Sequence, residues 1–234
     1  MNTAMPICDV VVLVSGGIDS TVLLHQVCNE NKHVAALSMH YGQRHQKELD
    51  CARFQAEKVG TRSFLVLELG MLGTFLKDAS ALIVDGAAVP DLKALKDTER
   101  EQPPTYVPNR NMILLSVAAA YAETIGASTI YYGAQAQDEY GYWDCTVPFL
   151  DCINATLALN RKNSIVVEAP LIQNSKADNV RLGLELGVDF SQTWSCYRGG
   201  ELACGVCPTC VERIKAFETL GYTDPLPYSS RVMS

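Results

Sequence analysis

The sequence VVVLVSGGIDST, residues 10–21, decides the fold class of this chain. Its first part, Val10 to Val14, is a continuous apolar run of the kind that forms a strand buried on both faces of a parallel sheet. The run ends at Ser15-Gly16-Gly17, after which apolar residues recur at helical spacing (Ile18, Val22, Leu23 and Val27). A buried strand that turns through glycines directly into a helix is typical of α/β proteins.

The alternation of strand and helix patterns continues along the chain. Further strands are expected at 34–40, 63–69, 128–132 and 165–167, with helical patterns at 49–59, 111–125, 150–157 and 176–186. This order predicts a doubly wound parallel sheet of five strands in a three-layer, Rossmann-type α/β fold. Ligands of such sheets bind beyond the carboxyl ends of the strands, where residues 15–20 lie. The irregular stretch 70–106 is expected to be an insertion or a mobile loop.

Composition excludes several classes of protein. The 234 residues include 19 basic and 26 acidic side chains, for a net charge of −7. An acidic surface argues against broad, sequence-independent nucleic-acid binding, which needs cations to neutralise phosphates. The longest near-continuous apolar run, residues 113–122, is far shorter than the ~20 residues of a membrane span, and no secretory signal is visible. We therefore expect a soluble, cytoplasmic protein.

The loop of residues 15–20 has the features of an anion-binding site. Gly16 and Gly17 let the backbone approach an anion closely, and the following helix offers free N–H groups at the positive end of its dipole. Ser15 and Ser20 add hydroxyl donors. The loop has neither the lysine of a GxxxxGK[ST] pattern nor a GxGxxG pattern. The alternative is a tight turn followed by a capped helix.

Four of the nine cysteines fall within a short segment near the end of the sequence: Cys196, Cys204, Cys207 and Cys210. Four thiolates close a tetrahedral zinc sphere, so the spacing predicts one structural zinc ion rather than a catalytic one. Redox-active or merely free thiols, and an iron–sulfur cluster, are the alternatives. We expect a single domain over residues 1–234, with residues 190–234 forming a zinc-binding segment packed on it.

Residues 15–20 resemble the SGGxDS signature of the PP-loop ATP pyrophosphatase superfamily. Members use this loop to hold the pyrophosphate part of ATP and to split ATP between the α and β phosphates. Further segments occur in the order found in one family of that superfamily, QueC: 41–45 with Glu48, 106–111, 141–145, the four cysteines and 224–228. The resemblance spans residues 10–228 and identifies the chain as a member of the QueC family.

The resemblance implies a ligase of queuosine biosynthesis. Such an enzyme converts 7-carboxy-7-deazaguanine, ammonia and two ATP into 7-cyano-7-deazaguanine, through an adenylated acid and an amide, with release of AMP and pyrophosphate. It also implies ATP with Mg²⁺ as co-substrate and a homodimer. One alternative is an enzyme that stops at the amide or joins the activated base to another amine, for example on a protein. Another is a zinc-bearing nucleotide-binding module without catalysis.

The resemblance also assigns residues to roles. The catalytic residues are Asp19, a candidate magnesium ligand, with Lys176 and Arg110. Nucleotide binding is assigned to the loop and one arginine: Val14, Ser15, Gly16, Gly17, Ile18, Asp19, Ser20, Thr21 and Arg44. Recognition of the base and its carboxylate is assigned to Asp138, Tyr142, Asp144 and Arg110. A solvated lysine at a helix start, and arginines in surface salt bridges, are the alternatives for the three cations.

Residues 138–146 depart from the family pattern D-x-S-G-Y-P-D-C-R. Tyr140, Trp143 and Thr146 stand where serine, proline and arginine are expected. If Trp143 lines the pocket, it should stack on the base or cover the site. Thr146 carries no charge, so recognition of the carboxylate would fall to the remaining cations, Arg110 among them. The nitrile remains the expected product.

Overall fold

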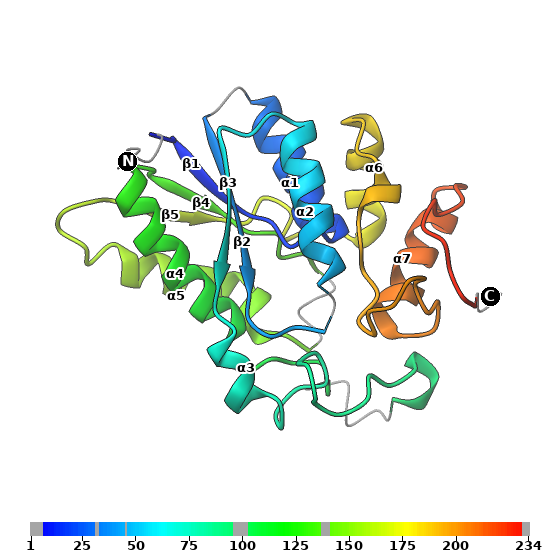
Figure 1. Ribbon diagram of the computed structural model, residues 1–234. Coiled ribbons are helices and arrows are strands. Elements are labelled where there is room, and N and C mark those ends of the chain that lie inside the picture. Colours follow the sequence, from blue (N-terminus) through cyan, green and yellow to red (C-terminus); the bar gives the residue numbers. More distant parts are fainter. Residues whose placement is uncertain (1–6, 31–32, 45, 96–102, 137–140, 231–234) are drawn as a thin grey trace, which may run out of the picture.

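The computed structural model describes residues 7–30, 33–44, 46–95, 103–136 and 141–230. Its centre is a five-stranded sheet in the order β3-β2-β1-β4-β5, and every neighbouring pair is parallel (Figure 1). The strands are β1 (Val10–Leu13), β2 (Val34–His40), β3 (Ser63–Glu68), β4 (Thr129–Tyr131) and β5 (Val166–Glu168). The predicted five-stranded parallel sheet is therefore confirmed.

Helices cover both faces of the sheet. They are α1 (Ile18–Asn29), α2 (Lys47–Lys58), α3 (Met71–Leu76), α4 (Arg110–Ile125), α5 (Val147–Leu157), α6 (Lys176–Glu185) and α7 (Pro208–Thr219). Figure 1 shows α1 and α2 on one side of the sheet and α4 and α5 on the other. The resulting three layers match the doubly wound arrangement expected from the sequence.

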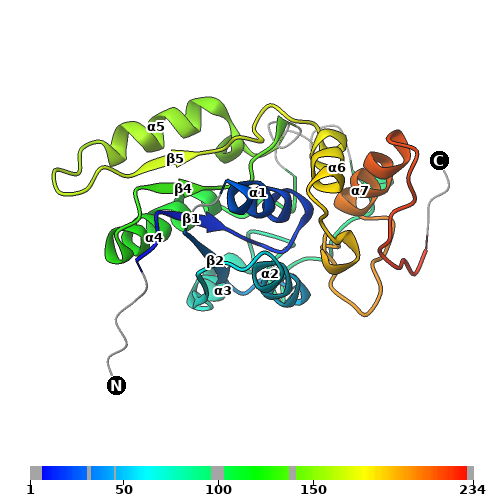
Figure 2. The same ribbon diagram turned by 90° about the horizontal axis from the view of Figure 1, so that it is seen from above.

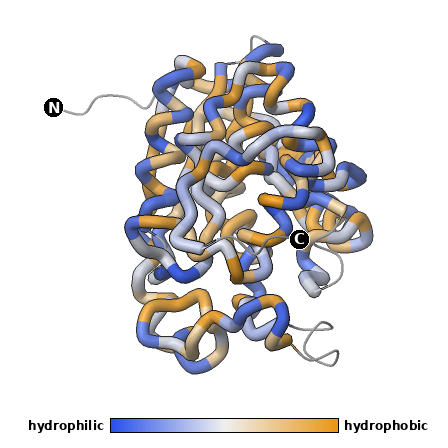
Figure 3. Tube along the Cα trace, turned by 90° about the vertical axis from the view of Figure 1, so that its right-hand side faces the viewer, coloured by the Kyte–Doolittle hydropathy of each residue, from blue (hydrophilic) through white to orange (hydrophobic). Residues whose placement is uncertain are grey.

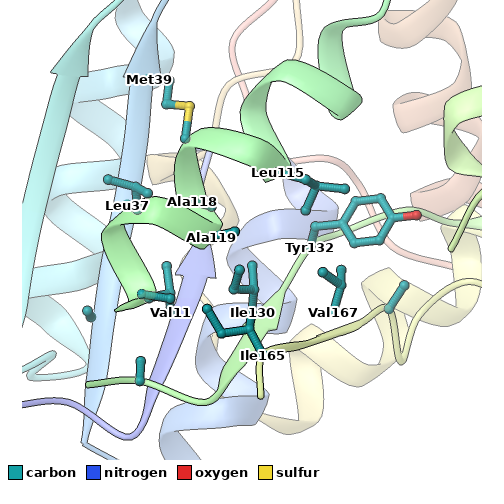
Figure 4. Packing of buried hydrophobic residues seen from close by; sticks show 14 of the residues in the cluster. Val11, Leu37, Met39, Leu115, Ala118, Ala119, Ile130, Tyr132, Ile165 and Val167 are labelled. Carbon is teal, nitrogen blue, oxygen red and sulfur yellow. The ribbon is translucent and has the colours of Figure 1, made fainter. Parts of the chain in front are cut away.

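Two hydrophobic clusters fill the space between the layers. In the first, Leu115 and Ala118 of α4 pack on Val11 of β1 and Ile130 of β4 (Figure 4). In the second, α1, α2 and α6 pack on the opposite sides of β1 and β2. Since β1 is buried on both faces, its residues are all apolar, and each large buried side chain contributes roughly 1.5–3 kcal/mol of transfer free energy.

The stretch 70–106 is more regular than its sequence suggests. Its described part contains α3 and a short 3-10 helix, Leu92–Ala94. Leu82 and Ile83 are buried, and Ile83 forms an isolated β-bridge with Gln43 at the exit of β2. Six residues with a glycine among them are too few to show a helical period, so α3 could not be predicted from the pattern of apolar residues.

The C-terminal segment packs beside α6. Helix α7 contacts α6 and lies beyond it, away from the sheet (Figure 2). The buried guanidinium of Arg213 donates to both carboxylate oxygens of Asp224, at 2.8 and 3.0 Å, and to the hydroxyl of Thr193 at 2.7 Å. These bonds tie α7 to the segments before and after it. The expected limits of a zinc-binding segment, 190–234, stay a prediction.

Hydrophilic and hydrophobic residues alternate along much of the trace (Figure 3). Among the residues that the structure describes, no helix combines the length and the apolar composition that crossing a membrane requires.

Candidate active site

A cavity of about 290 Å³ opens beyond the carboxyl ends of the central strands. It lies where the strand order reverses between β1 and β4, which is the position at which doubly wound sheets bind their ligands. The predicted residues that line it are Val14, Ser15, Gly17, Ile18, Asp19, Ser20, Arg110, Tyr142 and Lys176. The structure thus brings the loop of residues 14–20, called the phosphate loop below, to the same cavity as two of the three predicted cations, Arg110 and Lys176.

The phosphate loop is shaped by its glycines. Gly16 has φ +90, and a side chain there would collide with the backbone carbonyl of Glu48 on α2. The two serine hydroxyls lie 2.9 Å apart, and the Ser15 hydroxyl accepts the Gly17 N–H at 3.2 Å. Gly17 precedes α1 and offers no side-chain cap, so the first N–H groups of the helix are open to an anion in the cavity.

Asp19 and Lys176 form an ion pair at the edge of this loop. Lys176 Nζ lies 2.5 Å from Asp19 Oδ2, and Asn179 Nδ2 donates to Asp19 Oδ1 at 2.8 Å. Both charged side chains are mostly buried, with 14% of Lys176 and 16% of Asp19 exposed. The pair places one cation and one carboxylate beside the helix terminus, which suits phosphate and a divalent cation respectively.

Arg110 lies in another wall of the cavity, at the first residue of α4. Burial by itself lowers the pKa of its guanidinium, but Tyr41 and Cys145 beside it raise that pKa above the ordinary value for arginine. The hydroxyl of Tyr41 is a hydrogen-bond partner of Arg110, and burial raises the pKa of this phenol. Arg110 is therefore a fixed positive charge that faces the cavity.

Two predicted substrate residues have different positions. Tyr142 lines the cavity, and its hydroxyl lies 2.8 Å from that of Thr105. Asp144 is not among the lining residues: it is buried, and its Oδ2 accepts the backbone N–H of Asn111 on α4 at 3.0 Å. Asp138 lies outside the described residues, as does Tyr140.

Two of the altered positions, Trp143 and Thr146, lie outside the cavity lining, although Tyr142 and Cys145 of the same loop line the cavity. Trp143 is 48% exposed and is not a lining residue, so the expectation that it stacks on a base or covers the site finds no support in the structure. Its Nε1 donates instead to the hydroxyl of Tyr106 at 2.8 Å. Thr146 caps α5 by accepting the N–H of Phe149 at 3.4 Å. Both substitutions serve the fold around the site.

Three residues of the predicted nucleotide set do not line the cavity. Arg44 donates to the carbonyl oxygens of Ala81, Gly86 and Ala87 and so fastens the 70–106 stretch. Thr21 is fully buried on α1, one residue past the lining residues. Gly16 acts through its backbone, whose carbonyl accepts the N–H of Trp194 at 2.9 Å.

Several lining residues were not predicted. They come from the exit of β2, from α2 and from the C-terminal segment: Tyr41, Gln43, Glu48, Trp194, Ser195, Tyr197, Thr209 and Glu212. Tyr41 and Glu48 stand in a segment that carried the family resemblance, which was a usable signal. The residues from 194 onward show no local pattern of a site; only their closeness to the cysteines marked them.

The four cysteines form a compact cluster. Their Sγ atoms all lie within 4.8 Å of one another, and those of Cys204 and Cys210 are 4.0 Å apart. A Zn–S distance of ~2.3 Å sets the sulfurs of a tetrahedral site roughly 3.8 Å apart. Backbone N–H groups of Cys204 and Cys207 point at the sulfurs of Cys196 and Cys204, both at 3.3 Å, which favours thiolates. The cluster fits a closed, four-thiolate metal site.

Comparisons with known proteins agree with this geometry. Residues 9–221 match the family described as queuosine biosynthesis protein QueC. The 7-cyano-7-deazaguanine synthase of Clostridium kluyveri is 41% identical over 224 residues, covering 93% of this chain and 96% of that one. The enzyme of the same name from Hahella chejuensis is 41% identical, covering 94% and 93%.

A solved structure shares the architecture. The NMN synthetase from Francisella tularensis superposes with a TM-score of 0.50 at 13% identity, covering 93% of this chain and 79% of that one. At this identity the likeness concerns the fold alone.

Proposed function

The chain belongs to the QueC family of queuosine biosynthesis proteins, and from this premise we propose its reaction and the residues that perform it. It is an ATP-using ligase that forms carbon–nitrogen bonds, and its product is 7-cyano-7-deazaguanine. One observation carries the residue assignments: a single cavity joins the phosphate loop and the Asp19–Lys176 pair to the buried cation Arg110. This is what transfer of AMP to a carboxylate requires.

At the nucleotide end, residues 14–20 hold the β and γ phosphates of ATP. The open N–H groups of α1 and the hydroxyls of Ser15 and Ser20 donate to phosphate oxygens. Lys176 neutralises the charge that develops on the leaving pyrophosphate. Asp19 is a ligand for Mg²⁺, which when bound draws electron density from the phosphates.

The reaction activates oxygen twice. A carboxylate oxygen of 7-carboxy-7-deazaguanine attacks the α phosphorus, pyrophosphate leaves, and ammonia then displaces AMP to give the amide and a proton. The amide oxygen attacks the α phosphorus of a second ATP, pyrophosphate leaves again, and loss of AMP together with both N–H protons of the former amide leaves the nitrile. No side-chain nucleophile is needed, so the protein acts by orientation and charge stabilisation.

At the substrate end, Arg110 binds the carboxylate of the deazaguanine. Its permanent charge and its planar donors suit a carboxylate, and its neighbours hold it in place. Tyr142 contributes to the same wall. We assign Asp144 to positioning, because it binds the N-terminus of α4, and we leave recognition of the base N–H groups to Asp138 as a proposal.

The nitrile, rather than the amide or a conjugate, is the product that the cavity favours. Of the three departures from the family pattern, Trp143 and Thr146 lie outside the cavity lining, and Thr146 caps a helix. Their chemistry therefore does not alter the surface that meets the substrate.

The cysteine cluster holds a structural zinc ion in this proposal. Cys196, Cys204, Cys207 and Cys210 provide four sulfur ligands, and a closed sphere leaves no position for substrate. The ion would cross-link the segment that carries Trp194 and Tyr197 into the cavity wall. Nine thiols and a thiolate site are stable in a reducing compartment, so we also propose a cytoplasmic location. The homodimer stays a prediction for sedimentation to test.

The test is product analysis with purified protein, ATP, 7-carboxy-7-deazaguanine and ¹⁵N-ammonium. We expect a nitrile that carries one ¹⁵N atom, with two AMP and two pyrophosphate released for each nitrile. ADP as the main nucleotide product would overturn the phosphate-loop assignment. Accumulation of the amide, or of an adduct with another amine, would overturn the nitrile as product.

A further inference from the structure

We propose that Trp143 and Tyr106 are positioning residues for the substrate wall of the cavity. The hydrogen bond between them fixes the first turn of α4 and thereby the direction of the Arg110 side chain. This inference rests on the proposed function, in which Arg110 binds the substrate carboxylate.

Tyr106 connects the loop to the start of the helix. Its side chain is buried, and its hydroxyl oxygen accepts two hydrogen bonds, from Trp143 Nε1 at 2.8 Å and from the backbone N–H of Asn109 at 3.1 Å. Asn109 is the residue before Arg110 and has φ 54 and ψ 24, a left-handed conformation that asparagine adopts more readily than most residues other than glycine. The bond from its backbone N–H to the Tyr106 hydroxyl holds this turn at the start of the helix.

The same loop also holds the residue after Arg110. Asp144 follows Trp143 in the chain, and its carboxylate accepts the N–H of Asn111 at 3.0 Å. The Asn111 side chain returns a bond from Nδ2 to the backbone oxygen of Asp144 at 3.1 Å. The loop thus acts on the backbone on both sides of Arg110, directly at Asn111 and through the Tyr106 hydroxyl at Asn109.

The exposure of Trp143 argues that it positions Tyr106, and does not serve mainly as a core residue or as a stacking partner for the substrate. Nearly half of its side chain meets solvent, and it does not line the cavity. Its ring meets Phe149 edge-on at 5.5 Å, and Thr146 Oγ1 donates to the Trp143 carbonyl at 2.9 Å. These contacts direct the indole N–H at Tyr106, so Trp143 acts on the substrate through Tyr106 and α4.

Three variants test the inference. Trp143→Phe keeps the ring and removes the donor, Tyr106→Phe removes the shared acceptor, and the double variant combines them. Tyr222→Phe, at an exposed tyrosine just after the end of α7, is the matched control. We measure KM for 7-carboxy-7-deazaguanine and for ATP, and hydrogen exchange of the amides of residues 109–112 in the ligand-free protein.

We expect KM for the deazaguanine to rise roughly fivefold in Trp143→Phe and roughly tenfold in Tyr106→Phe, the size of one and two lost hydrogen bonds. KM for ATP should change less than about twofold, since the phosphate loop belongs to β1 and α1. The double variant should resemble Tyr106→Phe, because the bond that Trp143→Phe removes is one of the two bonds that Tyr106→Phe already removes. Amides 109–112 should exchange faster in each variant and at the wild-type rate in Tyr222→Phe.

Unchanged exchange at 109–112 would overturn the inference, and so would equal rises in KM for both substrates. If Tyr106→Phe does not fold, Trp143→Phe decides alone. A wild-type protein that makes no nitrile would contradict the proposed function instead, and hydrogen exchange would still show whether Trp143 holds the start of α4.

Discussion

Two walls of the cavity are built in different ways. The phosphate wall is a contiguous loop, residues 14–20, whose shape follows from two glycines between a strand and a helix. The C-terminal wall runs from Trp194 to Glu212 and contains little regular structure before α7. It depends on the cysteine cluster and on the buried Arg213–Asp224 pair.

The two walls should therefore respond differently to substitution. The phosphate wall is held by a sheet that would form without its polar side chains, so changes to those side chains should affect turnover alone. The C-terminal wall has no sheet beneath it, so loss of a cross-link there should affect stability and turnover together. Four substitutions probe this contrast.

The largest effect is expected for Cys207→Ser, which removes a ligand buried in the centre of the cluster. Without the metal, the segment from 194 to 212 loses its cross-link, so we expect the melting temperature to fall by more than about 10 °C. Elemental analysis should find one zinc per wild-type chain and less in the variant. Cys152→Ser, at an exposed cysteine, should keep both values. A wild-type protein without zinc would contradict this expectation.

Arg213→Leu should have the next largest effect. It leaves the carboxylate of Asp224 buried without its cation, which costs about 3–5 kcal/mol in the free energy of unfolding. Urea denaturation measures this loss. The control is Arg181→Leu, which breaks an exposed ion pair with Asp178 and should cost at most about 1 kcal/mol. Equal losses in the two variants would mean that the buried pair does not hold the C-terminal wall.

Asp19→Asn tests the phosphate wall. It keeps the size of the side chain and removes the charge beside Lys176, so we expect kcat to fall by at least about 100-fold. Because the pair borders an open cavity, solvent can take the place of the lost charge, and the protein should remain folded. Asp50→Asn, an exposed carboxylate in the first turn of α2, should retain full activity. Retained turnover in Asp19→Asn would rule out the magnesium assignment.

The smallest effect on catalysis is expected for Arg44→Gln. The sequence predicted Arg44 to bind nucleotide, whereas the structure has it donating to three backbone carbonyls of the 70–106 stretch. KM for ATP should therefore stay within about twofold, while unfolding becomes easier by about 1–2 kcal/mol. The two measurements are substrate titration and urea denaturation. A large rise in KM for ATP would restore the original assignment.

The contrast between a wall built from one contiguous segment and walls built from distant segments also explains what could be predicted from the sequence. The five strands and their helices were predicted because apolar runs and helical spacing are local patterns. The phosphate loop was predicted for the same reason: Ser15, the glycines and Asp19 are neighbours along the chain. Asp19 and Lys176 are distant in sequence. Their pairing could be predicted only because each of them follows the end of a predicted strand, and the ends of parallel strands meet at one edge of the sheet.

The other walls depend on contacts that no local pattern records. Arg110 was proposed from its motif, but its partner Tyr41 lies just after β2, far away in the sequence, and no spacing links the two. Stacking by Trp143 on a base was expected only if that side chain lines the pocket, and it is not a lining residue. Its hydrogen-bond partner, Tyr106, could not be predicted, because the two residues are distant in sequence and meet only where the loop packs against the start of α4.

The backbone bond from Trp194 to Gly16 also has a consequence for the order of synthesis. The phosphate loop leaves the ribosome long before residue 194, but the bond that braces it waits for that residue and for the cysteines that follow. Chains emerge from the N-terminus onward. A nascent chain therefore carries its nucleotide loop unbraced until residue 194 has been added, and a prematurely terminated product that ends before residue 194 lacks this brace.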